Sequence, residues 1–399
     1  MKKIFQPSYL VAIGILLSVM TVCSCSKTDV DNDDNDDDNT ALVELGDVTG
    51  KVVLLGNPLT EKYKDGTKSV YARNIWDMHA FDNKIYFGSG NSSNEGPAPN
   101  SGPAVLWSYD VAKKDFIKEF TTIDEQIHLI REFDNELYIP GHDSRGPGGW
   151  SIGNFYRLEG NEWKTYNTIP NAIHVYDIHK WEGKLFAAIG PQAQDKSIQI
   201  SADGGQTWKG ATNAISRIYS LYVIDNKLWT SNGITVYSKE TDFFSMPSPP
   251  VSTSVLGARI ERAVVFDGQT VFISGKTDND HQYLPIDLRC ASDIYNINIL
   301  NLPQDALPRD ILIKNKQLYV LISVKINDNT YRNAVLGASA LSDSSTSSVE
   351  WTELFHFTAE SFARSFEYLN GVFYFGLGCE TEVLAPVTGN ILSFNFAGQ

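Results

Sequence analysis

The chain is short of cysteine, of basic residues relative to acidic ones, and of long apolar runs. Four cysteines in 399 residues cannot make a disulfide framework, and Cys290 and Cys379, the two beyond the N-terminal region, are predicted to be free and buried. No C-x-x-C motif or Cys/His cluster predicts zinc, so we expect no metal site and no cofactor. The formal net charge of −15 would repel phosphate backbones and anionic membrane surfaces, which excludes nucleic acid as a partner.

One apolar run is present, at the N-terminus, and it indicates export. It covers residues 10–22, follows the basic start Met1-Lys2-Lys3, and is too short to span a bilayer comfortably. The sequence Val22-Cys23-Ser24-Cys25 resembles a lipobox, which implies that Cys25 is the lipidated first residue of the mature chain. We therefore predict a signal peptide over residues 1–25 and an outer-membrane lipoprotein on the surface of a Gram-negative cell. Ordinary secretion with cleavage nearby is the alternative.

The next segment, residues 26–42, is predicted to be an acidic, disordered tether. Residues 26–40 hold seven aspartates, one lysine and one apolar residue, too little apolar surface to fold. The segment lacks the glycine and terminal glutamate of a calcium-binding EF-hand loop, and it resembles the export signal of Bacteroidetes surface lipoproteins. Without it and the two N-terminal lysines, 30 basic and 41 acidic residues remain, so the folded part is acidic as well.

An internal repeat organises the remaining chain. Seven segments share the pattern of an apolar strand, a tight turn such as Asp-Asn or Asn-Gly, and an apolar-aromatic strand, at spacings of 43 to 55 residues: 76–90, 128–142, 176–190, 219–233, 262–276, 309–323 and 364–378. Their equivalent central residues are Ile85, Leu137, Leu185, Leu228, Val271, Leu318 and Phe373. Hairpins repeated at this spacing are typical of propeller blades. The sequence therefore predicts an all-β fold, a monomeric seven-bladed β-propeller of four-stranded antiparallel blades over residues 43–399.

The last repeat is predicted to borrow a strand from the start of the domain. Its chain stops after a third strand, while the segment "GKVVLLG" at 50–56 precedes the first repeat and is not used by it. We expect residues 50–56 to pair beside 389–396, because joining the two ends of the ring removes its exposed sheet edges.

One turn carries a known signature. Ser201, Asp203, Gly205 and Trp208 follow the spacing S-x-D-x-G-x-T-W, which resembles the Asp-box (BNR repeat) of bacterial sialidases and many other β-propellers. We expect this turn to join the third and fourth strands of blade three, with Asp203 accepting backbone N–H bonds. Its role is then structural, and the resemblance implies that it lies on the face opposite the ligand pocket.

The candidate binding site lies where the innermost strands begin. Nine residues before each central position, four consecutive repeats carry an aromatic or histidine side chain and three carry arginine: Trp76, His128, Tyr176, Tyr219, Arg262, Arg309 and Arg364. Long loops on the same face, at 90–103, 141–153, 276–292 and 378–389, add the aromatic and histidine residues Trp150, Tyr283 and His142. Arginines suit carboxylate or sulfate groups and aromatics suit sugar faces. Alternatively, these arginines pair with Asp310, Glu261 and Glu367 and tie the blades together.

Two functions remain open from the sequence. The Asp-box and the repeats resemble sialidase-like, glycan-active propellers, which implies as catalytic candidates Tyr176 or Tyr219 as the nucleophile and Asp77 as the acid/base. Asp77 and Asp177, two repeats apart, are also candidates for a pair of catalytic carboxylates. The Phe-Arg-Ile-Pro signature of sialidases is absent, however, and the arginines fall on three adjacent repeats. We therefore expect a non-catalytic, surface-anchored propeller that binds a glycan or a partner protein. A glycoside hydrolase or lyase acting on an acidic glycan is the alternative.

Overall fold

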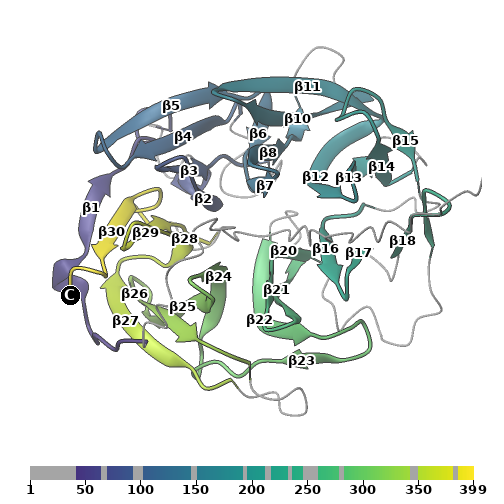
Figure 1. Cartoon of the computed structure of the whole chain (residues 1–399). Helices are drawn as coiled ribbons and strands as arrows, with labels where there is room; N and C mark the ends of the chain where they lie inside the picture. The colour runs from purple at the N-terminus through teal and green to yellow at the C-terminus, as the bar shows by residue number, and fades with distance from the viewer. Residues whose placement is uncertain are drawn as a thin grey trace, which may run out of the picture.

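The protein is a β-propeller whose four-stranded antiparallel sheets surround a central axis (Figure 1). The computed structural model describes residues 42–63, 70–92, 102–144, 151–191, 196–211, 217–231, 236–245, 259–277, 283–341, 349–380 and 385–399. Within these ranges the elements are strands, apart from two 3₁₀ turns at Thr49–Lys51 and Tyr71–Arg73. The same ranges contain no helix that is long and apolar enough to cross a membrane.

Six sheets are each built from four strands in chain order, with the first strand innermost (Figure 1). The first three are β2 (Asp77–Phe81), β3 (Lys84–Gly88), β4 (Val105–Asp110) and β5 (Asp115–Thr121); β7 (Arg131–Phe133), β8 (Glu136–Pro140), β10 (Ile152–Glu159) and β11 (Glu162–Pro170); and β12 (Ala172–Trp181), β13 (Lys184–Pro191), β14 (Ile198–Ser201) and β15 (Lys209–Gly210). The next three are β16 (Leu221–Ile224), β17 (Lys227–Thr230), β18 (Val236–Ser238) and β19 (Phe243–Ser245); β20 (Arg259–Phe266), β21 (Gln269–Thr277), β22 (Tyr283–Ala291) and β23 (Ile297–Ile299); and β24 (Leu307–Lys314), β25 (Gln317–Asn327), β26 (Thr330–Ala338) and β27 (Thr352–Ala359).

The seventh four-stranded sheet joins the two ends of the domain. It contains β28 (Ala363–Leu369), β29 (Val372–Leu377), β30 (Ile391–Asn395) and, on its outer edge, β1 (Val53–Gly56). Val53 lies opposite Ser393 and Leu54 opposite Leu392, so the predicted closure is confirmed. The preceding residues 45–48 pair with the neighbouring strand β27, where the Leu45 N–H donates to the carbonyl of Leu354 at 2.7 Å. The N-terminal segment thus joins two sheets.

Each predicted hairpin turn has the same backbone conformation. Both central residues have positive φ at all seven turns: Asp82 and Asn83, Asp134 and Asn135, Glu182 and Gly183, Asp225 and Asn226, Asp267 and Gly268, Asn315 and Lys316, and Asn370 and Gly371. This is the type I′ turn, whose twist matches that of the flanking strands and which favours Asn, Asp and Gly. The turn residues that define the repeat in the sequence are therefore the residues that the turn geometry requires.

The core lies between neighbouring sheets. The seven equivalent central residues of the repeat, from Ile85 to Phe373, are each at most 2% exposed. The apolar position near the start of each inner strand is buried as well, and Val264 of β20 shares one cluster with Ile311 of β24. The two cysteines of the folded part, Cys290 and Cys379, are free and buried, as expected.

Two segments predicted as loops contain strands. Within 141–153, β9 (His142–Ser144) pairs with β6 (Asp124–Gln126) as a separate two-stranded sheet. Within 276–292, β22 begins at Tyr283, and Pro285 faces Gly275 at a register shift, where the ladder does not need the missing N–H. Trp150 lies outside the described residues.

The Asp-box-like turn joins β14 to β15, as predicted. The Asp203 carboxylate accepts the Thr207 N–H at 2.9 Å and the Thr207 hydroxyl at 2.6 Å, and the Ser201 hydroxyl accepts the Gly205 N–H at 2.8 Å. Trp208 Nε1 donates to the Thr168 hydroxyl at 3.0 Å, which ties the turn to β11 of the neighbouring sheet. These bonds give the motif a structural role.

We predict that the charge of Asp203 stabilises the fold in a pH-dependent way. Hydrogen bonds from Thr207 and Ser201 lower the pKa of Asp203 to about 2, whereas an aspartate in the unfolded chain titrates near ~3.9. The stabilisation is therefore complete above the unfolded pKa and is lost as pH falls through the folded one. Asp203→Asn should lower the melting temperature at pH 7, and the gap to wild type should close between pH 4 and pH 2. A gap independent of pH, or an equal gap for Asp305→Asn on another exposed loop, would contradict this.

Candidate functional site

A hydrogen bond or ion pair joins each pair of neighbouring inner strands around the channel. Three of these bonds share one form, in which a buried aspartate accepts a backbone N–H of the next sheet: Asp77 from Ile130 at 2.7 Å, Asp177 from Leu221 at 2.9 Å and Asp310 from Phe366 at 3.1 Å. The other junctions use His128 with the Tyr176 carbonyl, the Ile260 N–H with Ser220, Arg262 with Asp310, and Ser365 with the Ile75 carbonyl. The inner-strand aspartates are therefore part of the ring's framework.

Arg262 spans the channel. Its Nε atom lies 2.9 Å from Asp310 Oδ1 on the neighbouring sheet, and its Nη2 atom lies 3.0 Å from Asp77 Oδ1 on β2. Nη2 also donates to the carbonyl of Trp76 at 2.8 Å. The alternative given above, that an arginine of this set ties blades together by pairing with Asp310, is therefore correct for Arg262.

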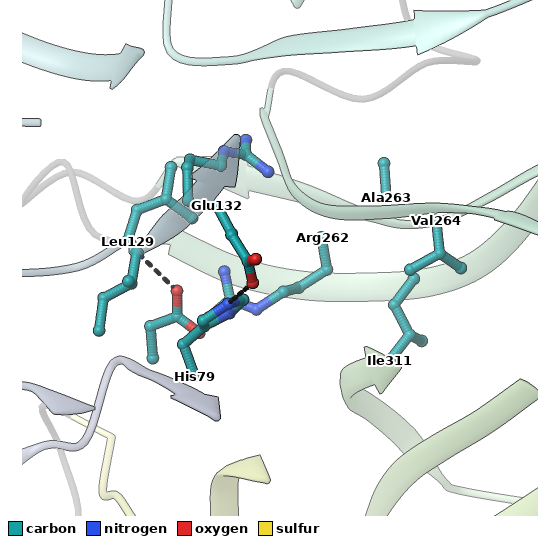
Figure 2. Close-up of a pocket in the computed structure, with 10 residues that line it drawn as sticks. His79, Leu129, Glu132, Arg262, Ala263, Val264 and Ile311 are labelled. Atoms are coloured by element: carbon teal, nitrogen blue, oxygen red, sulfur yellow. Dashed lines mark hydrogen bonds and ion pairs between the residues drawn. The ribbon is translucent and has the colours of Figure 1, made fainter. Parts of the chain in front are cut away.

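Below Arg262 is a pocket inside the channel, shown in Figure 2. His79 Nε2 lies 2.8 Å from Glu132 Oε2 across it, and Figure 2 shows Arg262 reaching toward this pair. Its lining is Asp77, His79, Leu129, Ile130, Arg131, Glu132, Arg262, Ala263, Val264 and Ile311. Two ion pairs lie within this lining, Asp77 with Arg262 and His79 with Glu132, whereas Arg131 pairs with Asp177 outside it.

A second pocket opens at the predicted mouth, and we call it the mouth pocket. It is lined by Trp76, Arg262, Tyr283, Pro285, Arg309 and Arg364. The Arg364 guanidinium lies over the Trp76 ring at 4.4 Å, and the Arg309 guanidinium lies over Phe362 at 3.7 Å. Three arginines from three adjacent sheets thus meet at one small cavity.

Glu380 bridges two of these arginines. Its Oε1 atom lies 3.1 Å from Arg309 Nη1, and its Oε2 atom lies 3.9 Å from Arg364 Nη2. Burial raises the pKa of Glu380, but the two guanidiniums outweigh burial and leave its pKa below the ordinary value. The Glu380 side chain is 30% exposed, whereas those of Arg309 and Arg364 are 4% and 7% exposed. Glu380 is therefore the most exposed of the three side chains.

The remaining predicted residues form an aromatic and histidine cluster. The ring of Tyr176 lies 4.6 Å from that of Tyr219 and 5.1 Å from that of His142, which in turn lies 4.7 Å from the ring of His128. The Tyr176 hydroxyl accepts a bond from Arg217 at 2.7 Å. Burial raises the pKa of Tyr176, which opposes the deprotonation that a tyrosine nucleophile requires.

His142, Asp143 and His174 are the residues, among those described, whose side chains could hold a metal ion. One ligand atom from each lies within 4.8 Å of the others, and all three side chains are buried. Two imidazoles and a carboxylate suit a first-row transition metal. The sequence spacing did not predict this group.

The structure divides the seven predicted site residues into two groups. Trp76, Arg262, Arg309 and Arg364 line the mouth pocket, whereas His128, Tyr176 and Tyr219 belong to the aromatic and histidine cluster. Arg259 lies between the groups, over the rings of Tyr219 and Tyr283 at 5.5 and 5.8 Å. Tyr219 and Arg262 are thus in different groups, but Trp76 lies with the arginines and not with the other aromatic residues.

Asp77 and Asp177 do not share a partner. Asp77 is paired with Arg262, whereas Asp177 Oδ2 lies 2.8 Å from Arg131 Nη2. Burial raises the pKa of Asp177, although Arg131 opposes that shift. Each carboxylate is held by an arginine and a backbone N–H, the pattern of a structural aspartate.

Sequence reasoning missed Arg131, Glu380, Asp143 and His174. A signal existed for His174, because it stands two residues before Tyr176 on one strand and alternate strand residues point to the same face. Glu380 and Asp143 follow the inner hairpins in segments without periodicity, so only the folded chain could place them.

Comparisons with known proteins support the fold. No protein-family model and no curated protein matches the chain. Among solved structures, a chain in the crystal structure of the mitotic checkpoint complex matches with a TM-score of 0.50 and 9% identity, over 89% of this chain and 98% of that one. An ancestral GH74 enzyme matches with a TM-score of 0.47 and 10% identity over 82% of this chain, which spans about half (48%) of that protein. BamB from Moraxella catarrhalis matches with a TM-score of 0.35 and 10% identity, over 81% of this chain and 85% of that one. At such identities the likeness concerns the fold alone.

We predict that Arg131 and Asp177 form a structural ion pair. Arg131→Met should lower the free energy of unfolding by about 3–5 kcal/mol, because it leaves the buried Asp177 charge unpaired. The double variant Arg131→Met/Asp177→Asn should lose less than Arg131→Met alone, since no unpaired charge remains and the amide oxygen still accepts the Leu221 N–H. Urea denaturation measures both, with Lys325→Met at an exposed pair as a control expected within about 0.5 kcal/mol of wild type. Strictly additive losses would contradict the pairing.

Proposed function

We propose that the protein is a non-catalytic seven-bladed β-propeller that binds an acidic glycan at the mouth pocket. The observation that carries the proposal is the meeting of Arg262, Arg309 and Arg364 at one cavity, with the accessible Glu380 across two of them. A ligand carboxylate or sulfate in the place of the Glu380 carboxylate would meet two guanidiniums, the geometry that arginine offers to such groups.

The proposed blade number rests on the sheets and the turns. Seven four-stranded sheets are found in the described residues, and seven type I′ hairpins begin them. We further propose that the Asp-box-like turn and the acidic segment after the lipobox place the protein with Asp-box propeller lipoproteins of the Bacteroidetes type.

Two aromatic residues line the mouth pocket, but both are buried. Trp76 is 3% exposed and lies under Arg364, and Tyr283 is 7% exposed and lies under Arg259. Trp76 therefore shapes the wall and orients the guanidinium, while a sugar ring would contact the pocket's rim.

The binding proposal is favoured over hydrolysis by the state of the candidate catalytic groups. Asp77 and Asp177 are each held by an arginine and a backbone N–H, and the pKa of Tyr176 is raised by burial. Most glycoside hydrolases use two free carboxyl groups that flank the scissile bond, and sialidases use an activated tyrosine; neither arrangement is present in these groups. A glycoside hydrolase or lyase remains the alternative, and a partner protein presenting a carboxylate is the second possible ligand.

The proposed location follows from the N-terminal sequence. Residues 1–41 lie outside the described residues, so the lipobox and tether rest on sequence alone. We propose that Cys25 carries lipid and that the tether holds the propeller at the outer membrane, with the mouth pocket available to ligands outside the cell.

We predict that Glu380 competes with acidic ligands. In a binding screen against polygalacturonate, chondroitin sulfate and neutral dextran, Arg309→Gln should weaken binding to the acidic polymers by about ten- to a hundredfold, the effect of one lost charge-assisted contact. Glu380→Gln should strengthen it, because the competing carboxylate is gone, and Glu353→Gln at the Arg332 pair should change nothing. The same samples are assayed for released sugar ends. Unchanged affinities in Arg309→Gln and Glu380→Gln would overturn the site, and sugar release by wild type would favour the hydrolase or lyase.

We predict that Cys25 anchors the protein. Wild-type protein should incorporate labelled fatty acid and sediment with membranes, whereas Cys25→Ala should appear in the soluble fraction. Cys23→Ala is the matched control and should remain anchored, because that cysteine precedes the cleavage site. Absence of label on the wild-type chain would contradict the prediction.

A further inference from the structure

The group formed by His142, Asp143 and His174, which we call the His/Asp group, has no part in the proposed function. It lies in the aromatic and histidine cluster, where the His174 ring packs 5.2 Å from Tyr176 and 5.8 Å from His142. Its side chains come from two different elements, β9 and β12.

The backbone holds the two elements in a fixed relation. The β6–β9 pairing places His142 opposite Gln126, and the Val175 N–H of β12 donates to the carbonyl of Gly141 at 3.0 Å. A Cβ atom at Gly141 would lie 2.6 Å from the carbonyl oxygen of Asn154, so glycine is required where the chain enters β9. Asp143 has φ +69°, a left-handed conformation that an aspartate adopts at a cost. That strained conformation sets where the Asp143 carboxylate lies.

One nitrogen of the group lacks a hydrogen-bond partner among the described residues. It is Nδ1 of His142, a residue that is only 2% exposed. Nδ1 of His174 lies 2.6 Å from Asp143 Oδ1, so these two side chains already meet as an imidazole–carboxylate pair. Buried polar groups are nearly always satisfied, so the His142 nitrogen is open to a ligand beside that pair.

The donor set defines the class of that ligand. Imidazole nitrogens suit Zn²⁺ and its first-row neighbours, whereas Ca²⁺ and Mg²⁺ prefer oxygen donors alone. Tetrahedral zinc with bonds of about 2.0–2.1 Å places its ligand atoms roughly 3.3 Å apart. The atoms of the group lie within 4.8 Å of one another, so small side-chain rotations would bring them into range.

We propose that His142, Asp143 and His174 bind one divalent first-row transition metal ion, with Zn²⁺ as the ion that the donors suit best. Three protein ligands leave a fourth position open. Arg217, bonded to Tyr176, and Arg259, over Tyr219, bring positive charge close to this position. That charge weakens the binding of a bare cation and favours an anionic fourth ligand such as hydroxide or a carboxylate.

Metal titration of the mature protein tests the proposal. After treatment with a chelator, Zn²⁺ should bind with one equivalent in calorimetry and raise the melting temperature by several degrees at a hundredfold excess over its dissociation constant. Co²⁺ should give the visible absorption bands of a nitrogen-ligated, four-coordinate ion, which the aspartates of the acidic tether cannot produce. Mg²⁺ should give neither response. If wild-type protein shows no Co²⁺ spectrum and no one-equivalent Zn²⁺ binding, the proposal is wrong.

Two variants locate the ion. Asp143→Gly removes a ligand while relieving the left-handed backbone, which offsets part of the stability lost with the His174 contact, and its melting temperature without metal is measured beside that of wild type. It should weaken Zn²⁺ binding by more than 100-fold, because loss of a residue that only contacts a ligand typically costs about 10–100-fold. His174→Ala should do the same.

The control is His356→Ala, because His356 pairs with Glu353 on β27, outside the group, and should keep wild-type metal affinity. Wild-type Zn²⁺ affinity in Asp143→Gly and His174→Ala would place the ion elsewhere and overturn the assignment. Neither outcome depends on glycan binding, which is measured in the separate polymer-binding screen.

Discussion

The ring depends on polar bonds between neighbouring inner strands. Apolar packing between sheets is non-directional, whereas a buried aspartate that accepts one particular N–H of the next sheet fixes how that sheet is placed. Burial makes each bond costly to leave unmade, since the carboxylate and the N–H would both lose water without gaining a partner. These bonds therefore help to determine which arrangement of sheets is stable, and they hold the mouth residues in place.

The three arginines of the mouth pocket differ in how exposed their acidic partners are. Arg262 is neutralised on two sides by Asp77 and Asp310, both nearly inaccessible, so its charge belongs to the framework. Arg309 and Arg364 share the partly exposed Glu380. Among these partners, Glu380 is thus the one carboxylate that the acidic group of a ligand could displace. Under the proposed function, this arrangement would let an acidic protein bind an acidic ligand without a broad basic surface.

The sequence predicted the β-propeller fold well because the fold depends on residues whose roles are local, in turns and in buried strand positions. Turn residues such as Asp82 and Asn83 are selected by the type I′ conformation, and the apolar residue at each central position is selected by burial between sheets. The strand at Val53–Gly56 could be paired with the last sheet because a ring cannot leave one edge open.

The site was predicted only in part. The repeat register places Trp76, Arg309 and Arg364 at one end of their strands, but it cannot show that Arg309 meets Glu380, which comes from a segment without a pattern. Nor does it distinguish an aspartate that faces a ligand from one, such as Asp177, that binds a backbone N–H of the next sheet. Partners of that kind come from strands dozens of residues apart.

The closing sheet also constrains the order in which the chain can fold. β1 is the first strand of the domain to leave a ribosome or an export channel, and its partner β30 is the last. Contacts at such sequence separation form slowly because a loop of almost the whole chain must close. Until then, β1 and the growing edge of the ring remain unpaired. Completion of the ring is consequently a late event in folding, because it must wait until the last strand of the domain is available.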